Sequence, residues 1–393
     1  MDRFSVNFCP MELNHDEIQR YGRQVLLPEI GLDGQKKLKD ARVLLVGVGG
    51  LGSPAAIYLT TMGVGTIGLI DADKVELSNL HRQVIHFSDD IGKPKVMSAK
   101  EKISQLNPHV RVMTYEARFN AENAMNIFKE FDLIIDGTDN FPARYLINDA
   151  ALLSDKPFVF GGIFRFEGQC SVFGFKGGPC YRCFFEQPPY PGSVPSCAEA
   201  GVMGVLPGII GLLQANEAVK IICGIGEPLS GRLLIFDGLA MRFREIKIKK
   251  NPACPMCGAH RTIDRLVEYT APVCVAPVSS VDGAGKKSAE ISVRELSRLF
   301  KQGRKDFFIL DVRNQSEWQM ARLPGAVLKP LNLLEKNYQD IPKDRTVYVH
   351  CQKGGRSQKA IEFLKTKGFN NLVNVRGGID AWSLEVDPTV PRY

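Results

Sequence analysis

The feature that most constrains the fold is a glycine-rich loop that follows an apolar stretch over residues 42–46. The loop contains the four glycines Gly47, Gly49, Gly50 and Gly52. A helical pattern begins directly after the loop. Glycines between a strand and a helix let the backbone approach a phosphate group at the helix N-terminus. Pro54 lies in the first turn of the expected helix, where its missing N–H has no intrahelical partner. The pattern therefore predicts a strand, a tight anion-binding turn and a helix.

Strand-like and helical segments alternate through the N-terminal part of the chain. The strand-like segments cover residues 42–46, 66–70, 111–116 and 132–135, and helical patterns cover 93–106 and 123–131. This alternation predicts an α/β fold with a Rossmann-like, mostly parallel sheet and helices on both faces. Further strand-like runs at 158–175 and 233–248 predict an added antiparallel portion.

A stretch rich in glycine, serine and proline separates two parts of the chain. Residues 271–289 have the composition of a flexible linker. We therefore predict an N-terminal domain over residues 11–270 and a second, small α/β domain over 290–390. A chain of 393 residues is long enough for two domains of this size.

Charge and hydropathy exclude several classes of protein. The formal net charge of +7 suits anionic ligands such as ATP or an acidic partner, but it is too small to indicate nucleic-acid binding. The apolar segment 204–223 contains Pro207, Glu217 and Lys220, so we expect a buried helix and no membrane contact. Ten cysteines without a visible secretory signal predict a reducing, cytoplasmic environment, where cysteines serve metal binding or catalysis.

Charged residues near the glycine-rich loop point to a nucleotide site. Asp71 ends the next expected strand, where a carboxylate can bind ribose hydroxyls. On this evidence alone an enzyme that uses NAD(P) or FAD fits equally well. Arg82, Lys95 and Arg23 supply more positive charge than a nicotinamide cofactor needs, and they favour a nucleoside triphosphate. Asp139 follows a later strand and is suited to hold Mg²⁺.

Residues 11 to about 262 resemble the MoeB/ThiF branch of the ubiquitin-activating enzyme superfamily. The matching motifs are Arg20-Tyr-Gly-Arg-Gln24, Gly47-Val-Gly-Gly-Leu-Gly52, Ser78-Asn-Leu-His-Arg-Gln83, Asp136-Gly-Thr-Asp-Asn140 and Ser196-Cys-Ala-Glu-Ala-Gly-Val202. The resemblance implies ATP-dependent adenylation of the C-terminal glycine of a ubiquitin-like sulfur-carrier protein with a Gly-Gly tail. It also implies Mg²⁺ bound by Asp139 and a homodimer in which Arg23 serves the partner subunit's site. The residues expected to bind the nucleotide are Gly47, Gly49, Gly50, Gly52, Asp71, Ser78, Asn79, Leu80, His81, Arg82, Lys95, Asp139 and Asn140.

Two C-x-x-C pairs predict a metal site. Cys180 and Cys183 form the first pair, and Cys254 and Cys257 form the second. Four thiolates can complete a tetrahedral Zn²⁺ site of the structural kind. A redox-active C-x-x-C is the alternative, although such a motif normally occurs once, at the start of a helix. The resemblance to the MoeB/ThiF branch favours structural Zn²⁺.

A reactive cysteine is expected in the C-terminal domain. Cys351 follows an apolar strand over residues 346–349 and begins a loop with two glycines, after which a helical pattern starts. Backbone N–H groups, the helix dipole and the charges of Lys353 and Arg356 would all stabilise a thiolate there. Four residues separate Cys351 from Arg356, one fewer than in the related loop of cysteine phosphatases, so the loop better fits a terminal sulfur atom.

The Cys351 loop resembles the active-site loop of rhodanese sulfurtransferases, whose cysteine carries a persulfide. The segments that support this resemblance are Leu310-Asp-Val-Arg313, Glu317-Trp318 and Leu323-Pro-Gly-Ala326. Cys197 matches a cysteine of the MoeB/ThiF branch that is proposed to take part in acyl or sulfur transfer. The alternative for Cys197 is a loop thiol with no obligatory role.

The two halves together predict one pathway, in which a carrier is adenylated and then receives sulfur from Cys351 to form a thiocarboxylate. The domain fusion is most similar to adenylyltransferase/sulfurtransferases that act on the small subunit of molybdopterin synthase. Carriers for thiamine synthesis, cysteine synthesis or tRNA thiolation remain open, as does the sulfur donor, either a cysteine desulfurase or thiosulfate. Two other classes also remain: an NAD(P)-dependent oxidoreductase with a thiol domain, and a non-catalytic zinc scaffold.

Overall fold

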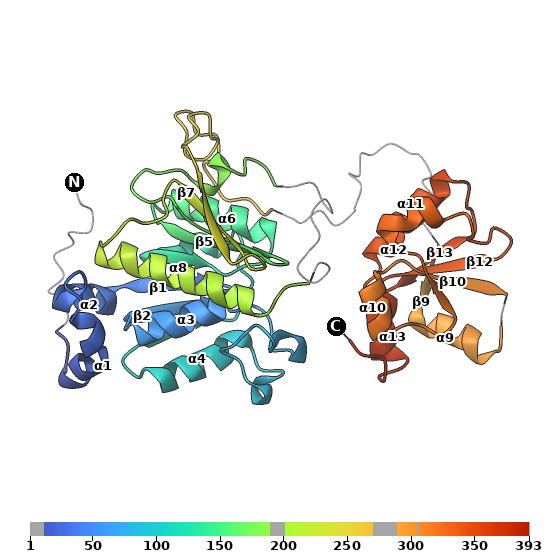
Figure 1. Ribbon diagram of the computed structural model, residues 1–393, viewed down its shortest axis with the longest axis horizontal. Coiled ribbons are helices and arrows are strands. Elements are labelled where there is room, and N and C mark those ends of the chain that lie inside the picture. The colour runs from blue at the N-terminus through green and yellow to red at the C-terminus, as the bar shows by residue number, and fades with distance from the viewer. Residues whose placement is uncertain (1–11, 189–200, 270–288, 305, 393) are drawn as a thin grey trace. The chain divides into compact units, whose positions relative to one another are not determined.

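The computed structural model describes residues 12–188, 201–269, 289–304 and 306–392 (Figure 1). The chain divides into two compact units, Met1–Ala276 and Pro277–Tyr393. Cys197 and residues 271–288 of the predicted linker lie outside the described ranges. The exact domain boundaries therefore stay a prediction.

The first unit contains, within its described residues, an eight-stranded sheet in the order β3-β2-β1-β4-β5-β6-β7-β8. Strands β3 to β5 pair in parallel, and β5 to β8 pair antiparallel. This confirms the mostly parallel sheet with an added antiparallel portion. The strands are β1 Arg42–Val46, β2 Thr66–Ile70, β3 Arg111–Tyr115, β4 Leu133–Asp136, β5 Phe158–Phe164, β6 Glu167–Phe173, β7 Arg232–Asp237 and β8 Arg242–Lys247.

Helices cover both faces of this sheet. Successive strand residues point to opposite faces, and in the parallel strands both sets of side chains are apolar and must be buried. Val43 and Leu45 of β1 pack in one apolar cluster with α2, α3, α4 and α8. Leu44 and Val46 pack in a second cluster with α5 and α6. The helices of this unit are α1 His15–Val25, α2 Gly31–Asp40, α3 Gly52–Thr61, α4 Lys95–Leu106, α5 Ala124–Phe128, α6 Phe141–Leu153 and α8 Val205–Cys223. Helix α5 is shorter than the predicted segment 123–131, because the chain leaves the helix before it enters β4.

Helix α8 is the apolar helix expected between the antiparallel strands. By length and composition alone it is apolar enough to cross a membrane, but it packs against α3, β5 and β6 inside the first unit. The contact with α3 is close, since a Cβ on Gly211 would lie 2.4 Å from the carbonyl oxygen of Leu51. Gly224 ends the helix in the left-handed conformation. Helix α8 is therefore a core helix, as predicted.

The second unit is a smaller parallel α/β domain with the strand order β11-β10-β12-β13-β9. Its strands are β9 Glu290–Ser292, β10 Phe307–Asp311, β11 Ala326–Leu328, β12 Thr346–His350 and β13 Leu372–Arg376. Its helices are α9 Val293–Lys301, α10 Gln315–Met320, α11 Leu334–Asn337, α12 Gly355–Thr366 and α13 Gly378–Glu385. Asp311 of β10 pairs in register with His350 of β12, so the loops after these two strands meet at one edge of the sheet.

Candidate functional site

The glycine-rich loop joins β1 to α3 with almost no free space around its backbone. Gly47 has φ +92°, and a Cβ there would meet the carbonyl oxygen of Gly137 at 2.9 Å. A Cβ on Gly52 would lie 2.1 Å from the carbonyl oxygen of Gly47. The two glycines thus let the loop pack against the turn after β4 and against the start of α3. Gly52 serves this packing and does not line the pocket described next.

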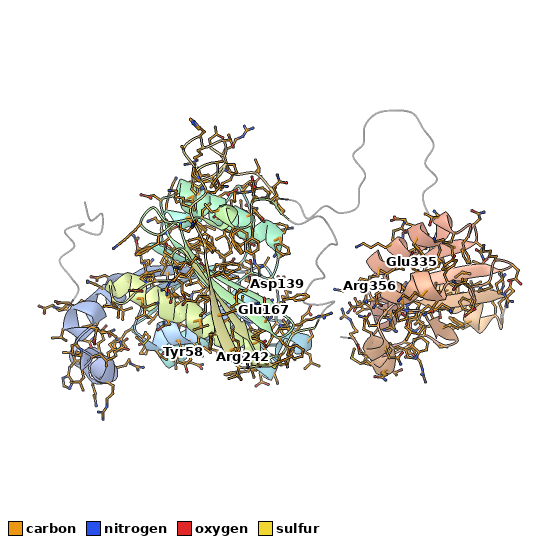
Figure 2. All side chains as sticks on the ribbon, turned by 45° about the horizontal axis from the view of Figure 1, so that its top comes forward. Tyr58, Asp139, Glu167, Arg242, Glu335 and Arg356 are labelled. Carbon is orange, nitrogen blue, oxygen red and sulfur yellow. The ribbon has the colours of Figure 1, made fainter. Side chains whose placement is uncertain are left out.

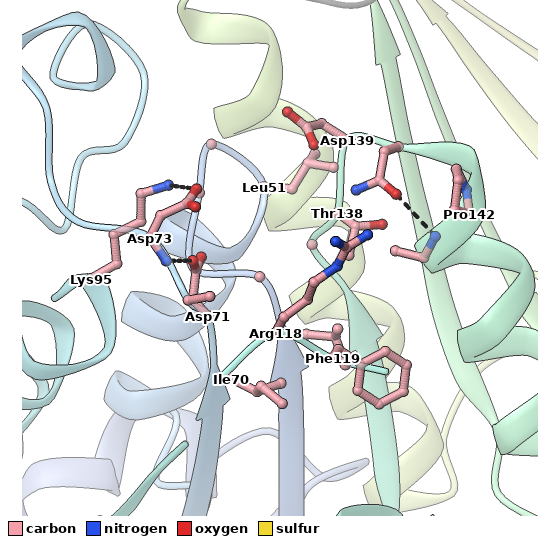
Figure 3. A pocket seen from close by; sticks show the side chains of 18 of the residues that line it. Leu51, Ile70, Asp71, Asp73, Lys95, Arg118, Phe119, Thr138, Asp139 and Pro142 are labelled. Carbon is pink, nitrogen blue, oxygen red and sulfur yellow. Dashed lines mark hydrogen bonds and ion pairs between the residues drawn. The ribbon is translucent and has the colours of Figure 1, made fainter. Parts of the chain in front are cut away.

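A cavity of about 490 Å³ opens at the carboxyl ends of β1, β2 and β4 (Figure 3). Its lining includes eight residues that the sequence predicted to bind a nucleotide: Gly47, Gly49, Gly50, Asp71, Arg82, Lys95, Asp139 and Asn140. Figure 3 shows Lys95, Asp71 and Asp73 on one side of the pocket and Thr138 and Asp139 on the other. A crevice at the carboxyl ends of parallel strands is where α/β proteins bind ligands.

Two carboxylates order the β2 side of the pocket. Asp71 accepts a hydrogen bond from the N–H of Val48 at 2.8 Å and another from the N–H of Asp73 at 2.8 Å. Asp71 therefore ties the glycine-rich loop to the end of β2. Lys95 Nζ lies 2.8 Å from Asp73 Oδ2, with side-chain exposures of 7% and 71%, respectively. The mostly buried ammonium group of Lys95 is thus held at the cavity wall by a solvent-exposed partner.

The other predicted nucleotide residues of this region support Arg82 and do not line the cavity. Arg82 Nη1 donates to the carbonyl oxygen of Ser78 at 3.0 Å and lies 2.7 Å from His81 Nε2. Burial, together with the charge of Arg82, lowers the pKa of His81. Asn79 is buried and accepts from the N–H of Glu76 at 3.1 Å, and Leu80 follows it in the same turn. Arg23 is exposed on α1 and is absent from this pocket's lining.

The end of β4 and the turn after it carry two carboxylates, the buried Asp136 and the exposed Asp139, which Figure 2 labels. Asp136 is fully buried, and its Oδ1 accepts from the N–H of Thr138 at 3.0 Å and from its hydroxyl at 2.7 Å. Burial raises the pKa of Asp136, and the nearby guanidinium of Arg144 partly opposes this effect. Asn140 Oδ1 accepts from the N–H of Ala143 and so caps α6. Asp139 is left exposed in the pocket, where it can bind a cation.

Several residues of the pocket lining were not predicted to bind the nucleotide, although two of them, Gln83 and Thr138, lie within the motifs quoted above. The lining also contains Asp73, Gln83, Arg118, Phe119, Thr138, Glu268 and Tyr269. Arg118 could have been found, because a cation shortly after β3 lies at the same sheet edge as Asp71. Glu268 and Tyr269 carry no such signal, since they reach the pocket from the far end of the unit. Glu268 is anchored there by the N–H of Ala121, which donates to its carboxylate at 2.6 Å.

The four cysteines of the two C-x-x-C pairs form one cluster, as predicted. Their sulfur atoms all lie within 4.8 Å of one another, with Cys180–Cys254 at 3.6 Å and Cys183–Cys257 at 3.3 Å. Zn–S bonds of about 2.3 Å in a tetrahedron require sulfur atoms about 3.8 Å apart. The N–H of Asn251 also donates to Cys183 Sγ at 3.4 Å, a contact that suits a thiolate. The cluster can therefore hold a metal ion such as zinc.

Cys351 lies directly after β12 and is only 2% exposed. Its Sγ accepts a hydrogen bond from the N–H of Gly354 at 3.1 Å, and the hydroxyl of Ser357 lies 3.6 Å away. Gly354 has φ +103° and precedes α12, so the sulfur faces the start of this helix. A Cβ on Gly378 would lie 2.3 Å from the carbonyl oxygen of Cys351. Strand, loop and two glycines thus fix the position of the sulfur.

The sequence predicts that Arg356 adds positive charge around Cys351, but the folded domain pairs this arginine with a carboxylate. Its two terminal nitrogens lie 2.7 Å from the two carboxylate oxygens of Glu317, on α10. Burial acts to raise the pKa of Glu317, but the hydrogen bonds from Arg356 and from the N–H of Asn314 lower it below its ordinary value. Arg356 is therefore neutralised by a partner 39 residues away, whereas Lys353 is exposed.

Comparison with known proteins agrees with this geometry. Residues 21–256 match the ThiF family, and residues 292–385 match the rhodanese-like domain. The chain belongs to the ThiF family. It is 44% identical to a protein of Mycobacterium tuberculosis named "Probable adenylyltransferase/sulfurtransferase MoeZ", over 97% of this chain and 96% of that protein. It is 40% identical to the adenylyltransferase and sulfurtransferase MOCS3 of Anopheles gambiae, over 98% of this chain and 91% of that protein.

Other relatives match about two thirds of the chain. A sulfur carrier protein adenylyltransferase of Thermus thermophilus is 50% identical over 66% of this chain and 98% of its own length. The crystal structure of PaaA superposes with a TM-score of 0.53 at 28% identity, over 63% of this chain and 78% of that chain. MccB of E. coli shares the fold, with a TM-score of 0.56 at 23% identity over 62% of this chain and 74% of its own.

These relatives confirm the resemblance deduced from the motifs. This ThiF-family chain is an adenylyltransferase and sulfurtransferase, and ATP use follows from the first of these activities. The classes of NAD(P)-dependent oxidoreductase and non-catalytic scaffold are therefore set aside.

Proposed function

We propose that the chain adenylates the C-terminal glycine of a ubiquitin-like sulfur carrier and then converts that terminus to a thiocarboxylate. One observation carries the proposal: a single chain contains both sites. The first is a nucleotide-sized cavity lined by Asp71, Lys95 and Asp139, and the second is an ordered loop around Cys351. The relative from Thermus thermophilus, named a sulfur carrier protein adenylyltransferase, supports the choice of a carrier as substrate.

In the first step the terminal carboxylate of the carrier attacks the α-phosphorus of ATP, and pyrophosphate leaves. We assign the glycine-rich loop, Arg82 and Lys95 to the phosphates and Asp71 to the ribose hydroxyls. Asp139 would hold Mg²⁺, which neutralises phosphate charge during the transfer. Arg23 of the partner subunit in a homodimer would add a further cation. Gly52, Ser78, Asn79, Leu80, His81 and Asn140 would act by holding the loop, Arg82 and the start of α6 in place.

In the second step sulfur moves from Cys351 to the activated carbonyl. The terminal sulfur of a Cys351 persulfide attacks the acyl-adenylate, AMP leaves, and an acyl disulfide forms. A second thiol, for which Cys197 is the candidate, attacks Cys351 Sγ and releases the thiocarboxylate. The resulting disulfide between the two cysteines is then reduced by a cellular thiol.

The cysteine cluster would hold structural Zn²⁺, because it has no fifth ligand among the described residues. Its members are Cys180, Cys183, Cys254 and Cys257.

We favour the small subunit of molybdopterin synthase as the carrier, and so a role in molybdenum cofactor synthesis in the cytoplasm. The same chemistry on a carrier for thiamine synthesis, cysteine synthesis or tRNA thiolation is the alternative. The sulfur donor is either a cysteine desulfurase or thiosulfate. Nucleic acids and membranes have no part in this proposal.

Exchange of labelled pyrophosphate into ATP tests the first step. We expect exchange that depends on Mg²⁺ and on a carrier with an intact Gly-Gly end, and the carrier that supports it best identifies the substrate. Asp139→Ala should abolish the exchange in a folded protein. Cys351→Ala should retain the exchange and lose thiocarboxylate formation, while Cys170→Ala, which changes a buried core cysteine of the first unit, serves as the control. Absence of exchange with every carrier would refute the proposal.

A further inference from the structure

Two arginines of the domain that contains Cys351 are paired with carboxylates, whereas Lys353 of the loop is exposed. Both terminal nitrogens of Arg356 contact Glu317, and these two side chains are only 16% and 10% exposed. Arg313 is fully buried, and its Nε lies 3.0 Å from both carboxylate oxygens of Asp311. The guanidinium group of Arg356, five residues after Cys351, and that of Arg313 are therefore matched by carboxylates on α10 and β10, respectively. The site consequently offers a negatively charged sulfur donor much less attraction than its arginines suggest.

Glu317 is held in place by more than its ion pair. It occupies the third position of α10, where Oε2 accepts from the N–H of Asn314 at 2.9 Å and completes a capping box. The hydrogen bonds from Arg356 keep the carboxylate ionised at neutral pH. His350, next to Cys351, is fully buried, and burial lowers its pKa, so it adds no charge at neutral pH. The neutralisation of Arg356 is thus a fixed property of the folded domain.

We propose that Glu317 is a specificity-determining residue of the sulfurtransferase site, which neutralises Arg356 and so selects a persulfide donor over dianionic thiosulfate. The inference rests on the proposed role of Cys351 and narrows the sulfur donor, which that role leaves open. The preferred donor is an alkyl persulfide, such as one carried on a cysteine.

Both donors transfer sulfur by the same exchange. The Cys351 thiolate attacks the terminal sulfur of the donor, and the new S–S bond makes the Cys351 persulfide. The old S–S bond breaks, and the electron pair leaves with sulfite from thiosulfate or with a thiolate from a persulfide. The two donors differ in the charge that must approach the loop. An unpaired arginine would favour the dianion, whereas a paired arginine removes that advantage.

The test is Glu317→Gln in the full chain, because glutamine can keep the capping box while it removes the negative charge. Sulfur transfer to cyanide is measured with three donors: thiosulfate, a dianion; benzenethiosulfonate, a monoanion; and 2-hydroxyethyl persulfide. We expect kcat/KM for thiosulfate to rise on the order of tenfold. The gain for benzenethiosulfonate should be close to the square root of that gain, and the gain for the persulfide, which carries at most one negative charge, should not exceed that of benzenethiosulfonate. Added salt should shrink the gains, since it screens the freed charge.

Matched variants separate this electrostatic effect from a structural one. Asp306→Asn removes a carboxylate that pairs with Arg304 before β10, at the opposite end of the sheet from Cys351, and should change no ratio between donors. Arg356→Gln removes the guanidinium partner of Glu317 and its positive charge, and it should lower thiosulfate use. The double variant of Glu317 and Arg356 should return the donor ratio toward that of the unmodified protein.

Equal changes for all three donors, or gains that salt does not reduce, would overturn the inference. The proposed function fails in a different way, namely if Cys351→Ala still transfers sulfur to cyanide. An unchanged donor ratio in Glu317→Gln, with Cys351 still essential, rejects only the role of Glu317.

Discussion

Replacement of Gly52 by alanine should disable the nucleotide site through a single methyl group. The added Cβ would lie 2.1 Å from the carbonyl oxygen of Gly47, whereas real Cβ atoms essentially never approach within 3.0 Å. The loop and α3 must therefore separate by about 1 Å, and neither partner is a flexible side chain. Overpacking of this kind costs about 1–3 kcal/mol, and a backbone contact belongs at the upper end. We expect the first unit to lose about 2–3 kcal/mol and its Tm to fall by about 5–10 °C.

The same shift should displace the pocket wall formed by Gly47 and Gly49. A misplacement of about 1 Å can cost about 100-fold in rate, so pyrophosphate exchange should fall by that order. Thermal unfolding and exchange are measured beside Gly208→Ala, whose Cβ meets nothing within 4 Å and which should be neutral or slightly stabilising. If Gly52→Ala kept normal stability and normal exchange, the close packing of loop and helix would be wrong.

Three further predictions concern the other sites. Cys254→Ser should reduce zinc content, measured by elemental analysis, by about tenfold or more, because three thiolates bind zinc far more weakly than four; an unchanged content would exclude the cluster as the site. Gly378→Ala should abolish sulfur transfer and spare pyrophosphate exchange, because its Cβ would lie 2.3 Å from the Cys351 carbonyl oxygen and 2.5 Å from that of Gln352. The pKa of Glu317 lies below its ordinary 4.5, so its stabilisation is present above pH 4.5 and is lost as the pH falls through the folded-state pKa. The stability difference between the unmodified protein and Glu317→Gln in urea should therefore shrink in acid, and a constant difference would contradict this.

Local pattern was sufficient to predict most elements of the fold. The strands over residues 42–46 and 66–70 have the predicted ends, because each apolar run is bounded by polar or glycine residues. The cysteine cluster was also predictable, since two C-x-x-C pairs can supply the four thiolates of a tetrahedral site. In these cases the residues that form the feature lie within short stretches of the sequence.

Side-chain pairing across distant segments could not be predicted. The sequence shows Arg356 beside Cys351, but only the folded domain brings Glu317 to it from α10. Asp73 holds Lys95 across 22 residues for the same reason, because only folding brings the segment after β2 to the start of α4. Glu268 reaches the pocket from beyond the last strand of the first unit, and no local pattern indicates this. Charges near a reactive group in sequence therefore say little about the net charge that the group experiences.

The most direct test of the central claim is the mass of the carrier's C-terminus after reaction. The full chain, ATP, Mg²⁺, a persulfide donor and a Gly-Gly carrier are incubated together, and the carrier is weighed intact. The account predicts the mass change of one oxygen replaced by sulfur, with no change when either ATP is omitted or Cys351→Ala is used. An unmodified carrier in the complete reaction, or sulfur incorporation without ATP, would contradict it.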